Sequence, residues 1–310
     1  MDEQFETTSL IKPSELVPLK AREDLPSIIR FSLHAGCFVI LAALITFNSE
    51  TVLIALPCTL LMAGVWAGFF APFHECIHHT AFQTPKFNYV CALISGVLFI
   101  STPTAYKSYH FQHHRFTQDP EHDPEISPEP ELRTQWPLSI SAWFSMLYQK
   151  CFLQEKIQYV VLFALTPLSQ WSEKIPYIPE DQQSKILTEA RIIFTFWLLL
   201  IAAFIFGALG AGWILLAGLL SHFFIAVWLS AEHTGLPCEG SIFNRARTVN
   251  TNRIVRFFIW NMNYHAEHHA WPFIPWHKLP TVHNMITEHL EHQETGYLSV
   301  HYNVIKQMPQ

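Results

Sequence analysis

Charged residues are scarce in this sequence. Asp, Glu, Lys and Arg make up 14% of the 310 residues, whereas a soluble domain usually has about 25% charged residues. The formal net charge is -6, so no overall positive field would attract nucleic acid, and we exclude that class of partner. The shortage of charge instead predicts that much of the chain contacts lipid.

Several short motifs are also absent. The six cysteines form no CxxC pair, which excludes the usual rubredoxin, zinc-ribbon and thioredoxin patterns. There is no HPGG segment of the kind found in fused cytochrome b5 domains, and no GxGxxG for a flavin or a nicotinamide. The acidic N-terminus, MDEQFETTSLIKPSELVPLK, lacks the basic segment and short apolar core of a cleavable signal peptide. We therefore expect neither a cleaved signal nor a built-in redox domain.

The uncharged residues are concentrated in two regions of the chain. Residues 31–49 and 51–73 carry only Glu50 between them as a charged residue, and each run can cross a hydrocarbon core of about 30 Å at about 1.5 Å per residue. Arg191 and Glu232 bracket a second uncharged region, which GALGAG divides near its middle. We predict four crossings in two helical hairpins, at about 31–48, 52–73, 192–209 and 212–231.

The positions of Lys and Arg predict how these hairpins are oriented. Neither residue occurs at 31–85 or at 192–244, so both hairpin tips lack positive charge. Because positively charged loops stay in the cytosol, we expect both termini and most of the polar chain to be cytosolic. Two further apolar runs, 89–100 and 157–168, are too short to span a membrane and should not cross it.

Nine of the 18 histidines fall into three groups, HECIHH, HFQHH and HAEHH. Residues three and four apart share one face of a helix, so each group would present its imidazoles to one side. Neutral imidazole is a good ligand for divalent iron, copper, nickel and zinc, and nine imidazoles exceed the about four ligands of one structural zinc ion. The groups predict a site for two metal ions, with the candidate ligands His74, His78, His79, His110, His113, His114, His265, His268 and His269.

The three groups can meet only on one side of the membrane. The first follows the second crossing and the third follows the fourth, so the run at 89–100 must not cross. A tenth histidine, His233, lies at the end of the fourth crossing, at the same depth as His74. Glu232 beside it could orient a ligand.

The spacing HxxxHH, HxxHH and HxxHH, with two crossings before and two after the second group, resembles the membrane-bound fatty acid desaturase and hydroxylase superfamily. HHRFTQDPEHDPE and NMNYHAEHHAWPFIPWHKLP resemble bacterial acyl desaturases in particular. The resemblance implies an all-α membrane protein whose cytosolic helical cap carries the histidines, here in a bacterial inner membrane. It covers about residues 30–285, leaving a cytosolic N-terminal segment, 1–29, and a cytosolic C-terminal tail, 286–310.

Carried over to this chain, the resemblance implies two ferrous ions, O2 as co-substrate and a long acyl or hydrocarbon substrate. The histidines of the three groups are the implied metal ligands, and His233 is an implied ligand that stands alone between the last crossing and the third group. His79 is either a ligand or a neighbour of the ligands. Leu229 stands where some acyl-CoA desaturases have Asn, which leaves one coordination position unassigned. Asn261 and Asn263 are the candidates for that position. The carboxylates that could tune or orient the ligands are Glu75, Glu232, Glu267, Asp119 and Asp123, and solvation at the surface explains the last two equally well.

The predicted function is oxygen-dependent desaturation of a fatty acyl or related lipid chain. Electrons would come from a separate ferredoxin, rubredoxin or cytochrome b5 type donor. Hydroxylation of an alkane, carotenoid or acyl chain is the alternative, because the two reactions diverge only after the first hydrogen is removed. A metal transporter or sensor is disfavoured, since a transporter would place polar ligands inside its crossings and only His34 and His222 lie there.

Overall fold

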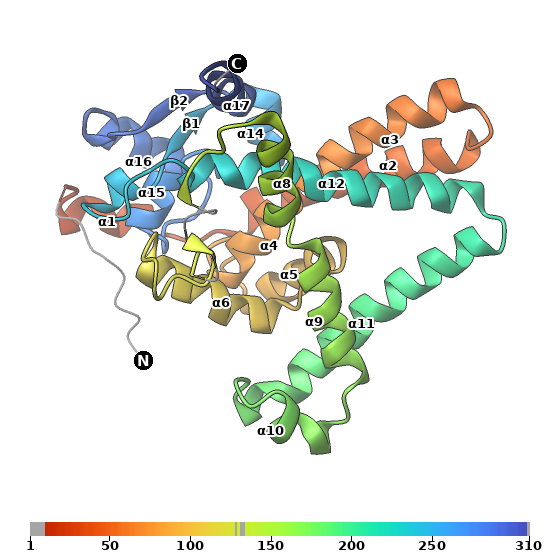
Figure 1. The fold of residues 1–310 in the computed structure, drawn as a ribbon. Coiled ribbons are helices and arrows are strands. Elements are labelled where there is room, and N and C mark those ends of the chain that lie inside the picture. The colour runs from red at the N-terminus through yellow and green to blue at the C-terminus, as the bar shows by residue number, and fades with distance from the viewer. Residues whose placement is uncertain (1–9, 128, 131–133, 309–310) are drawn as a thin grey trace.

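The computed structural model describes residues 10–127, 129–130 and 134–308, and helices dominate these residues (Figure 1). Two short strands and two single 3-10 turns, Leu168–Gln170 and Thr287–His289, complete the secondary structure of the described chain. The elements are α1 Pro13–Leu19, α2 Asp24–Phe47, α3 Val52–Ala67, α4 Phe70–Ile77, α5 Pro85–Phe99, α6 Pro103–Phe116, α8 Ile140–Lys150, α9 Leu153–Leu165, α10 Trp171–Lys174, α11 Glu180–Ile205, α12 Leu209–His233, α13 Ile242–Arg245, β1 Thr248–Asn250, α14 Arg253–Phe258, α15 His265–Ala270, α16 Leu279–Ile286, β2 Gln293–Thr295 and α17 Tyr297–Lys306.

Within the described residues, four helical segments are long and apolar enough to cross a membrane: Asp24–Phe47, Val52–Ile77, Glu180–Ile205 and Leu209–His233. These segments overlap the four apolar runs at 31–48, 52–73, 192–209 and 212–231, although the first ends at Phe47 and the third ends at Ile205, four residues before 209. The third begins twelve residues before the predicted start at 192, because helix α11 continues through a charged first part that includes Asp181, Lys185 and Glu189. Absence of charge indicates where a helix can contact lipid, whereas backbone hydrogen bonding decides where the helix begins.

The apolar helices pack closely around Trp66 of α3, which is 1% exposed. Its indole Nε1 donates a hydrogen bond to the Leu98 carbonyl at 3.0 Å and so ties α3 to α5. Gly218 of α12 faces the same ring, and a Cβ at that position would lie 3.1 Å from Trp66 and 3.0 Å from Trp197. The missing side chain lets α12 approach α3 and α11, which sets the positions of the helix ends that carry His74 and His233.

The short apolar run at 89–100 forms all but the first turn of α5 and ends at its C-cap residue, Ile100, where the chain turns sharply. Ile100 takes the left-handed conformation with φ 58°, Pro103 occupies the first turn of α6, and the two helices are bent by 88°. Pro fits the first turn of a helix, because its missing N–H would have no partner there. The bend directs α6, and with it the second histidine group, toward α4.

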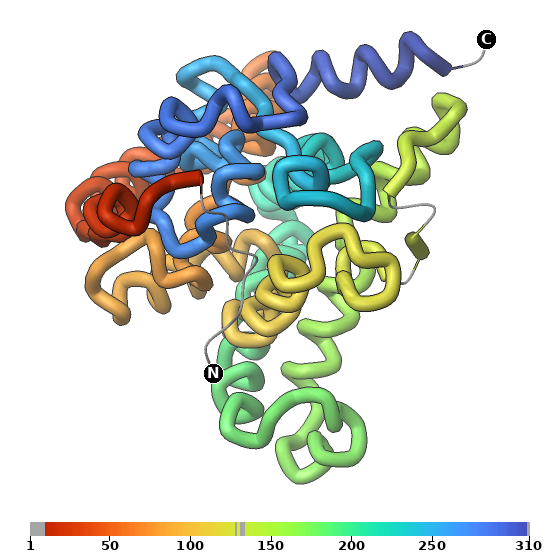
Figure 2. The backbone as a smooth tube through the Cα atoms, turned by 90° about the vertical axis from the view of Figure 1, so that its left-hand side faces the viewer, coloured from red at the N-terminus to blue at the C-terminus, as the bar shows by residue number. Residues whose placement is uncertain are grey.

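The C-terminal part of the chain folds back over the ends of α12 and α15. β1 pairs in parallel with β2, with Thr248 opposite Gln293 and Asn250 opposite Thr295. α1 near the N-terminus joins the same side of the molecule (Figure 2), since Ile11 and Leu19 pack in one core with residues of α13, α15 and α16. Both ends of the described chain therefore help to enclose the third histidine group.

Candidate metal centre

The structure brings eight of the ten candidate histidines into two buried groups. In each group, one ring nitrogen from every residue lies within 4.8 Å of those of the others. Group one consists of His74, His78, His110, His114 and His268, and group two of His113, His233 and His269. His265 adjoins group two, because its Nε2 lies 2.7 Å from Nε2 of His233.

Helical periodicity explains how one sequence motif serves both groups. His110 and His114 are one turn apart on α6 and share a face, whereas His113 lies about 100° round the axis from His114. The adjacent residues His268 and His269 of α15 are likewise divided between the groups. Helices α6 and α15 therefore each contribute to both groups, which holds the two groups next to each other.

Group one contains polar atoms that have been withdrawn from water without receiving hydrogen bonds. Nε2 of His114 lies 2.9 Å from Nε2 of His110 and 3.1 Å from Nε2 of His268. Among the described residues, neither ring nitrogen of His74 finds a hydrogen-bond partner, nor does Nε2 of His78. Leaving buried polar atoms unpaired costs about 1–3 kcal/mol each. A shared cation would satisfy these nitrogens together.

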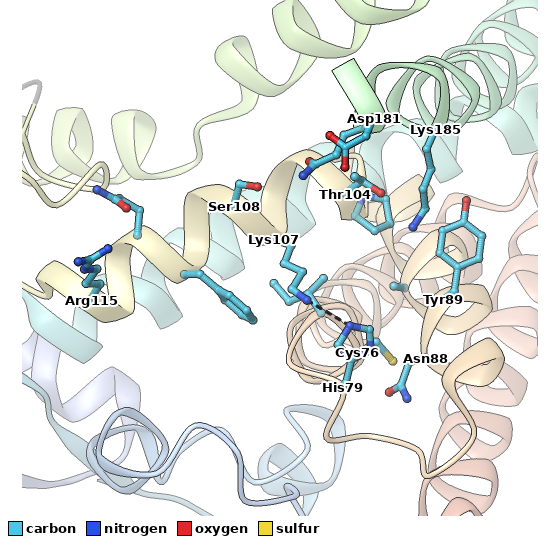
Figure 3. A pocket seen from close by; sticks show the side chains of 16 residues that line it. Cys76, His79, Asn88, Tyr89, Thr104, Lys107, Ser108, Arg115, Asp181 and Lys185 are labelled. Carbon is cyan, nitrogen blue, oxygen red and sulfur yellow. Dashed lines mark hydrogen bonds between the residues drawn. The ribbon is translucent and has the colours of Figure 1, made fainter. Parts of the chain in front are cut away.

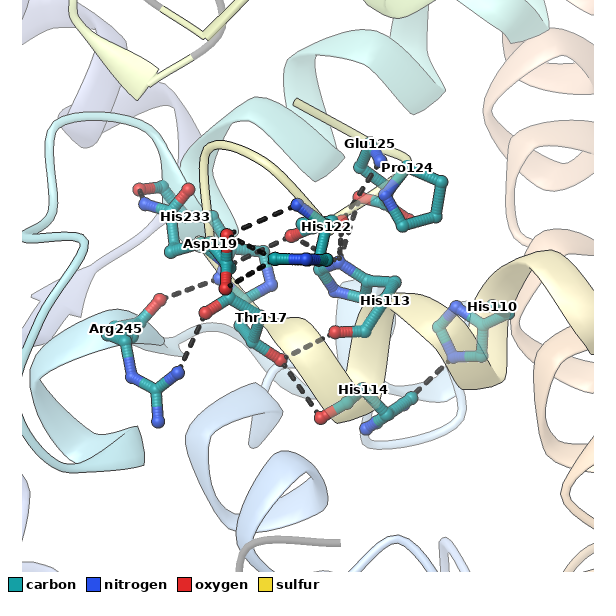
Figure 4. A network of polar contacts seen from close by, with 12 residues as sticks. His110, His113, His114, Thr117, Asp119, His122, Pro124, Glu125, His233 and Arg245 are labelled. Carbon is teal, nitrogen blue, oxygen red and sulfur yellow. Dashed lines mark hydrogen bonds and ion pairs between the residues drawn. The ribbon is translucent and has the colours of Figure 1, made fainter. Parts of the chain in front are cut away.

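In group two, each imidazole has its Nδ1 held by a neighbouring oxygen, and Figure 4 shows His113, His233, Thr117 and Arg245 in this network. His113 Nδ1 lies 3.0 Å from both carboxylate oxygens of Asp123. His233 Nδ1 donates to the Arg245 carbonyl at 2.7 Å, and His269 Nδ1 lies 3.2 Å from the Thr117 hydroxyl. Such contacts fix the tautomer of a metal-binding histidine. They leave Nε2 of all three rings to bind a metal.

Burial keeps most of these imidazoles neutral. It lowers the pKa of His110 and His265, and it lowers the pKa of His268 to about 3. His113 differs: burial opposes its protonation, but the carboxylates of Asp123 and Glu125 raise its pKa to about 9. Neutral rings offer a lone pair to a metal ion, and the two carboxylates supply negative charge beside group two.

The three candidate glutamates have different surroundings. Glu75 Oε2 accepts a 2.7 Å hydrogen bond from Thr80, and its Oε1 lies 3.7 Å from Nδ1 of His74. Glu232 Oε1 accepts from Trp228 at 2.8 Å and lies 3.5 Å from Nδ1 of His265. Both therefore adjoin candidate ligands.

The third, Glu267, is bonded to residues of β1 and α16. It accepts from Thr248 at 2.5 Å and pairs with His283 at 2.5 Å. These contacts join α15 to β1 and α16. Glu267 thus positions the helix that carries His268 and His269.

The two candidate asparagines differ in their surroundings, and so do the two candidate aspartates. Asn261 Nδ2 donates to the Trp276 carbonyl at 3.0 Å, whereas Asn263 is 1% exposed and its Oδ1 has no partner among the described residues. Asp123 is fully buried against His113. Asp119 pairs instead with His122 at 3.2 Å, with 38% of its side chain exposed.

His79 lies outside both groups. Its backbone takes the left-handed conformation with φ 57°, and its Nε2 lies 3.2 Å from Lys107 Nζ (Figure 3). The two side chains line a separate cavity of about 700 Å³, bounded also by Tyr89, Arg115 and Lys185.

We expect His79→Ala to retain the metal content of the wild type and to change the specific activity by less than about threefold, because surface substitutions usually have small effects. Metal analysis and product formation, measured side by side on the purified variant and wild type, would check this. Loss of one metal ion from the variant would place His79 among the ligands.

Two further residues of the site, Thr117 and Gln118, come three and four residues after the second histidine group and are not among the residues singled out above. The Thr117 hydroxyl donates to the His113 carbonyl at 2.9 Å as well as contacting His269. Gln118, with φ 63°, donates from Nε2 to the His233 carbonyl at 2.9 Å. Neither residue type indicates metal chemistry, and only their place after HFQHH could have drawn attention to them.

The donor set fits transition-metal ions. Imidazole suits iron, zinc, copper and nickel, and the two groups within the described residues offer imidazole nitrogens that converge from four helices. The unpaired nitrogens of His74 and the fixed tautomers of group two are both explained by such ions. We conclude that the chain has a buried metal site.

Comparison with known proteins agrees with this geometry. Residues 50–301 match the family model described as fatty acid desaturase. Among curated relatives, a sphingolipid delta(4)-desaturase of Komagataella phaffii is 27% identical over 219 residues, covering 67% of this chain and 54% of the relative. A sphingolipid delta(4)-desaturase of Candida albicans is 22% identical over 246 residues, covering 71% and 58%.

A sphingolipid delta(4)-desaturase DES1-like protein of Oryza sativa subsp. japonica is 25% identical over 225 residues, covering 71% of this chain and 60% of the relative. The chain thus spans less than two thirds of the length of each of these relatives. All three are eukaryotic, so they give no support to the predicted likeness to bacterial enzymes or to a bacterial inner membrane. The family match covers most of the chain and includes every histidine of both groups, and the protein belongs to the fatty acid desaturase family.

Proposed function

We propose that the protein is an oxygen-dependent desaturase that introduces a double bond into a lipid chain, using two ferrous ions held by groups one and two. The observation that carries this proposal is a largely apolar cavity of about 490 Å³ that has His113 and His233 in its wall. A hydrocarbon chain in this cavity would lie against group two. His265 would complete the ligands of that group, and Asn263 is the candidate for the unassigned position.

The bound irons and O2 would supply the oxidising power that acid–base groups lack toward an alkane C–H bond. Overall, two neighbouring carbons each lose one hydrogen, and O2 takes up these hydrogens with two external electrons and two protons to form two waters. The protein positions the reactants: Phe99, Val160 and Phe163 line the cavity and exclude water. Asp123 and the Arg245 carbonyl hold His113 and His233 in the metal-binding tautomer.

We also propose that the four apolar helices cross the membrane as two hairpins, with both termini and the metal site in the cytosol. The lack of Lys and Arg at both hairpin tips supports this orientation. On this proposal, residues 30–285 form the membrane domain with its helical cap. Electrons would reach the cap from a separate ferredoxin, rubredoxin or cytochrome b5 type protein.

The names of the three relatives favour a sphingolipid as the substrate, and we propose that lipid class here. The test is expression of the full chain with an electron donor, followed by mass spectrometry of lipid extracts. We expect an oxygen-dependent product that is lighter than its precursor by two hydrogens. A product heavier by one oxygen would indicate hydroxylation instead. Cells expressing His113→Ala provide the control for desaturation by the host.

A further inference from the structure

Helix α9 places a lysine in the wall of the cavity that reaches the metal site. Lys156 lines the same cavity as His113 and His233. Aromatic and apolar residues, Phe99, Phe152, Tyr159, Val160 and Phe163, make up much of the wall, together with the charged residues Lys150 and Glu155. A ligand that fills the cavity would therefore contact both Lys156 and group two.

The ammonium group of Lys156 contacts an aromatic ring and a single imidazole nitrogen. Its Nζ lies 3.6 Å from the centre of the Phe99 ring and 3.5 Å from Nδ1 of His222, the limit of a hydrogen bond. Phe99 and His222 are 4% and 2% exposed, and Lys156 itself is half-buried. Within the described residues, no carboxylate lies within ion-pair distance of Lys156.

The neighbouring histidine does not supply the missing negative charge. An ammonium can only donate hydrogen bonds, so Nδ1 of His222 must accept and its Nε2 must carry the proton. That Nε2 is buried and has no partner among the described residues. The pair Lys156 and His222 therefore has hydrogen-bond donors and lacks an acceptor.

The lack of an acceptor for the pair Lys156 and His222 lowers the stability of the folded protein. Withdrawing a charge from water without a partner is strongly unfavourable, and burial accordingly lowers the pKa of Lys156 to about 7, although Cys151 and Glu155 oppose the shift. Of the other α9 residues of this wall, Val160 and Phe163 are buried hydrophobic residues, whereas Glu155 and Tyr159 are exposed. A destabilising ionisable group beside a reaction site marks a functional residue.

We propose that Lys156 determines substrate specificity by donating a hydrogen bond to an uncharged acceptor oxygen, a hydroxyl or an amide carbonyl, in the polar part of the lipid. The proposal rests on the proposed function. The hydrocarbon chain would extend along the apolar wall to group two. The lysine would then fix how far the reacting carbons lie from the polar group.

The charges around the cavity favour a neutral polar group over an anionic one. Three carboxylates line the cavity, those of Asp123, Glu125 and Glu155, against two lysines, Lys150 and Lys156. Near Lys156, a phosphate or carboxylate would be repelled by the carboxylate of Glu155, which lines the same cavity. An uncharged hydroxyl or amide oxygen avoids the repulsion and still accepts from Lys156.

The test compares Lys156→Met, Lys156→Gln and the matched control Lys185→Met in the full-length, iron-loaded protein. Lys185 also lies over an aromatic ring, with its Nζ 4.4 Å from the centre of the Tyr89 ring, but it lines the separate cavity. The substrates are a dihydroceramide and a saturated analogue of equal chain length that lacks the hydroxyl and amide groups. KM, kcat and the midpoint of thermal unfolding are measured for each protein.

We expect Lys156→Met to raise KM for the dihydroceramide about 10-fold or more while kcat changes less than about threefold, because a hydrogen bond to a charged group is lost. Lys156→Gln keeps a donor and should restore part of the affinity. KM and kcat for the analogue should be the same in Lys156→Met as in wild type. Lys185→Met should have the KM and kcat of wild type on both substrates. The thermal midpoint of Lys156→Met should equal or exceed that of wild type, because the costly charge is gone.

Three results would overturn the inference. An unchanged KM for the dihydroceramide in Lys156→Met would show that the lysine does not contact the polar group, although the proposed function would stand. Equal losses on both substrates with a lowered thermal midpoint would assign Lys156 a structural role. A wild-type protein that desaturates neither lipid nor any lipid of its host would refute the proposed function, and this inference with it.

Discussion

If the proposed di-iron site is correct, replacing His113 by Ala is expected to reduce bound iron from about two ions per chain to about one and to abolish desaturation. Group two has three histidines that meet closely, with His265 beside them, and catalytic metal sites usually need about three protein ligands. Loss of an outer partner of a ligand already costs about 10- to 100-fold in metal affinity or activity, so loss of the ligand itself should cost at least 100-fold. Metal analysis of the purified protein and lipid mass spectrometry measure the two effects.

The matched control for this experiment is His122→Ala. His122 lies nine residues further along the same segment, with 54% of its side chain exposed and paired to Asp119. Its substitution should leave both ions and the activity in place. A His113→Ala protein that retained two ions and full activity would show that group two does not hold iron.

A second large effect is expected from Asp123→Asn. The fully buried carboxylate holds Nδ1 of His113 at 3.0 Å and also accepts from the backbone N–H groups of Gln118 and Glu125 at 2.9 Å. Asn has nearly the same shape, but its NH2 group would leave some of these donors unpaired and could favour the wrong tautomer of His113. We expect the iron affinity or activity to fall about 10- to 100-fold.

Asp119→Asn is the control for that substitution, because Asp119 lies in the same loop with 38% of its side chain exposed. It should change activity by less than about threefold, as for most exposed sites. Iron affinity can be measured by competition with a chelator. Equal effects of the two substitutions would contradict the role assigned to Asp123.

Some of the site could be predicted from the order of residues because it depends on local periodicity. His74 and His78, like His110 and His114, are four residues apart, so any helix places each pair on one face. Lack of charge located the four apolar helices in the same way. His79 shows the limit of this reasoning: it is next to His78 in sequence, but the left-handed turn at the end of α4 directs it to Lys107.

The acidic loop after HFQHH shows a second limit. Asp119 and Asp123 have the same chemistry and similar neighbours in sequence, and only the folded loop buries one and exposes the other. Thr117 and Gln118 gained their contacts with His269 and the His233 carbonyl in the same way. Their partners lie more than 100 residues away, beyond any local pattern.

The sequence by itself determined the family, the apolar helices and the set of histidines available to bind metal, because spacing and the absence of charge are properties of short segments. The tertiary structure alone decided how those histidines divide into two groups, which carboxylate holds His113, and that Lys156 lies in the cavity beside them. These features depend on the 88° bend between α5 and α6 and on the close approach of α12 to α3. The bend itself is local to Ile100 and Pro103, but the histidines that it brings together, like the helices that meet at Gly218, lie far apart in the sequence, and no single stretch specifies those contacts.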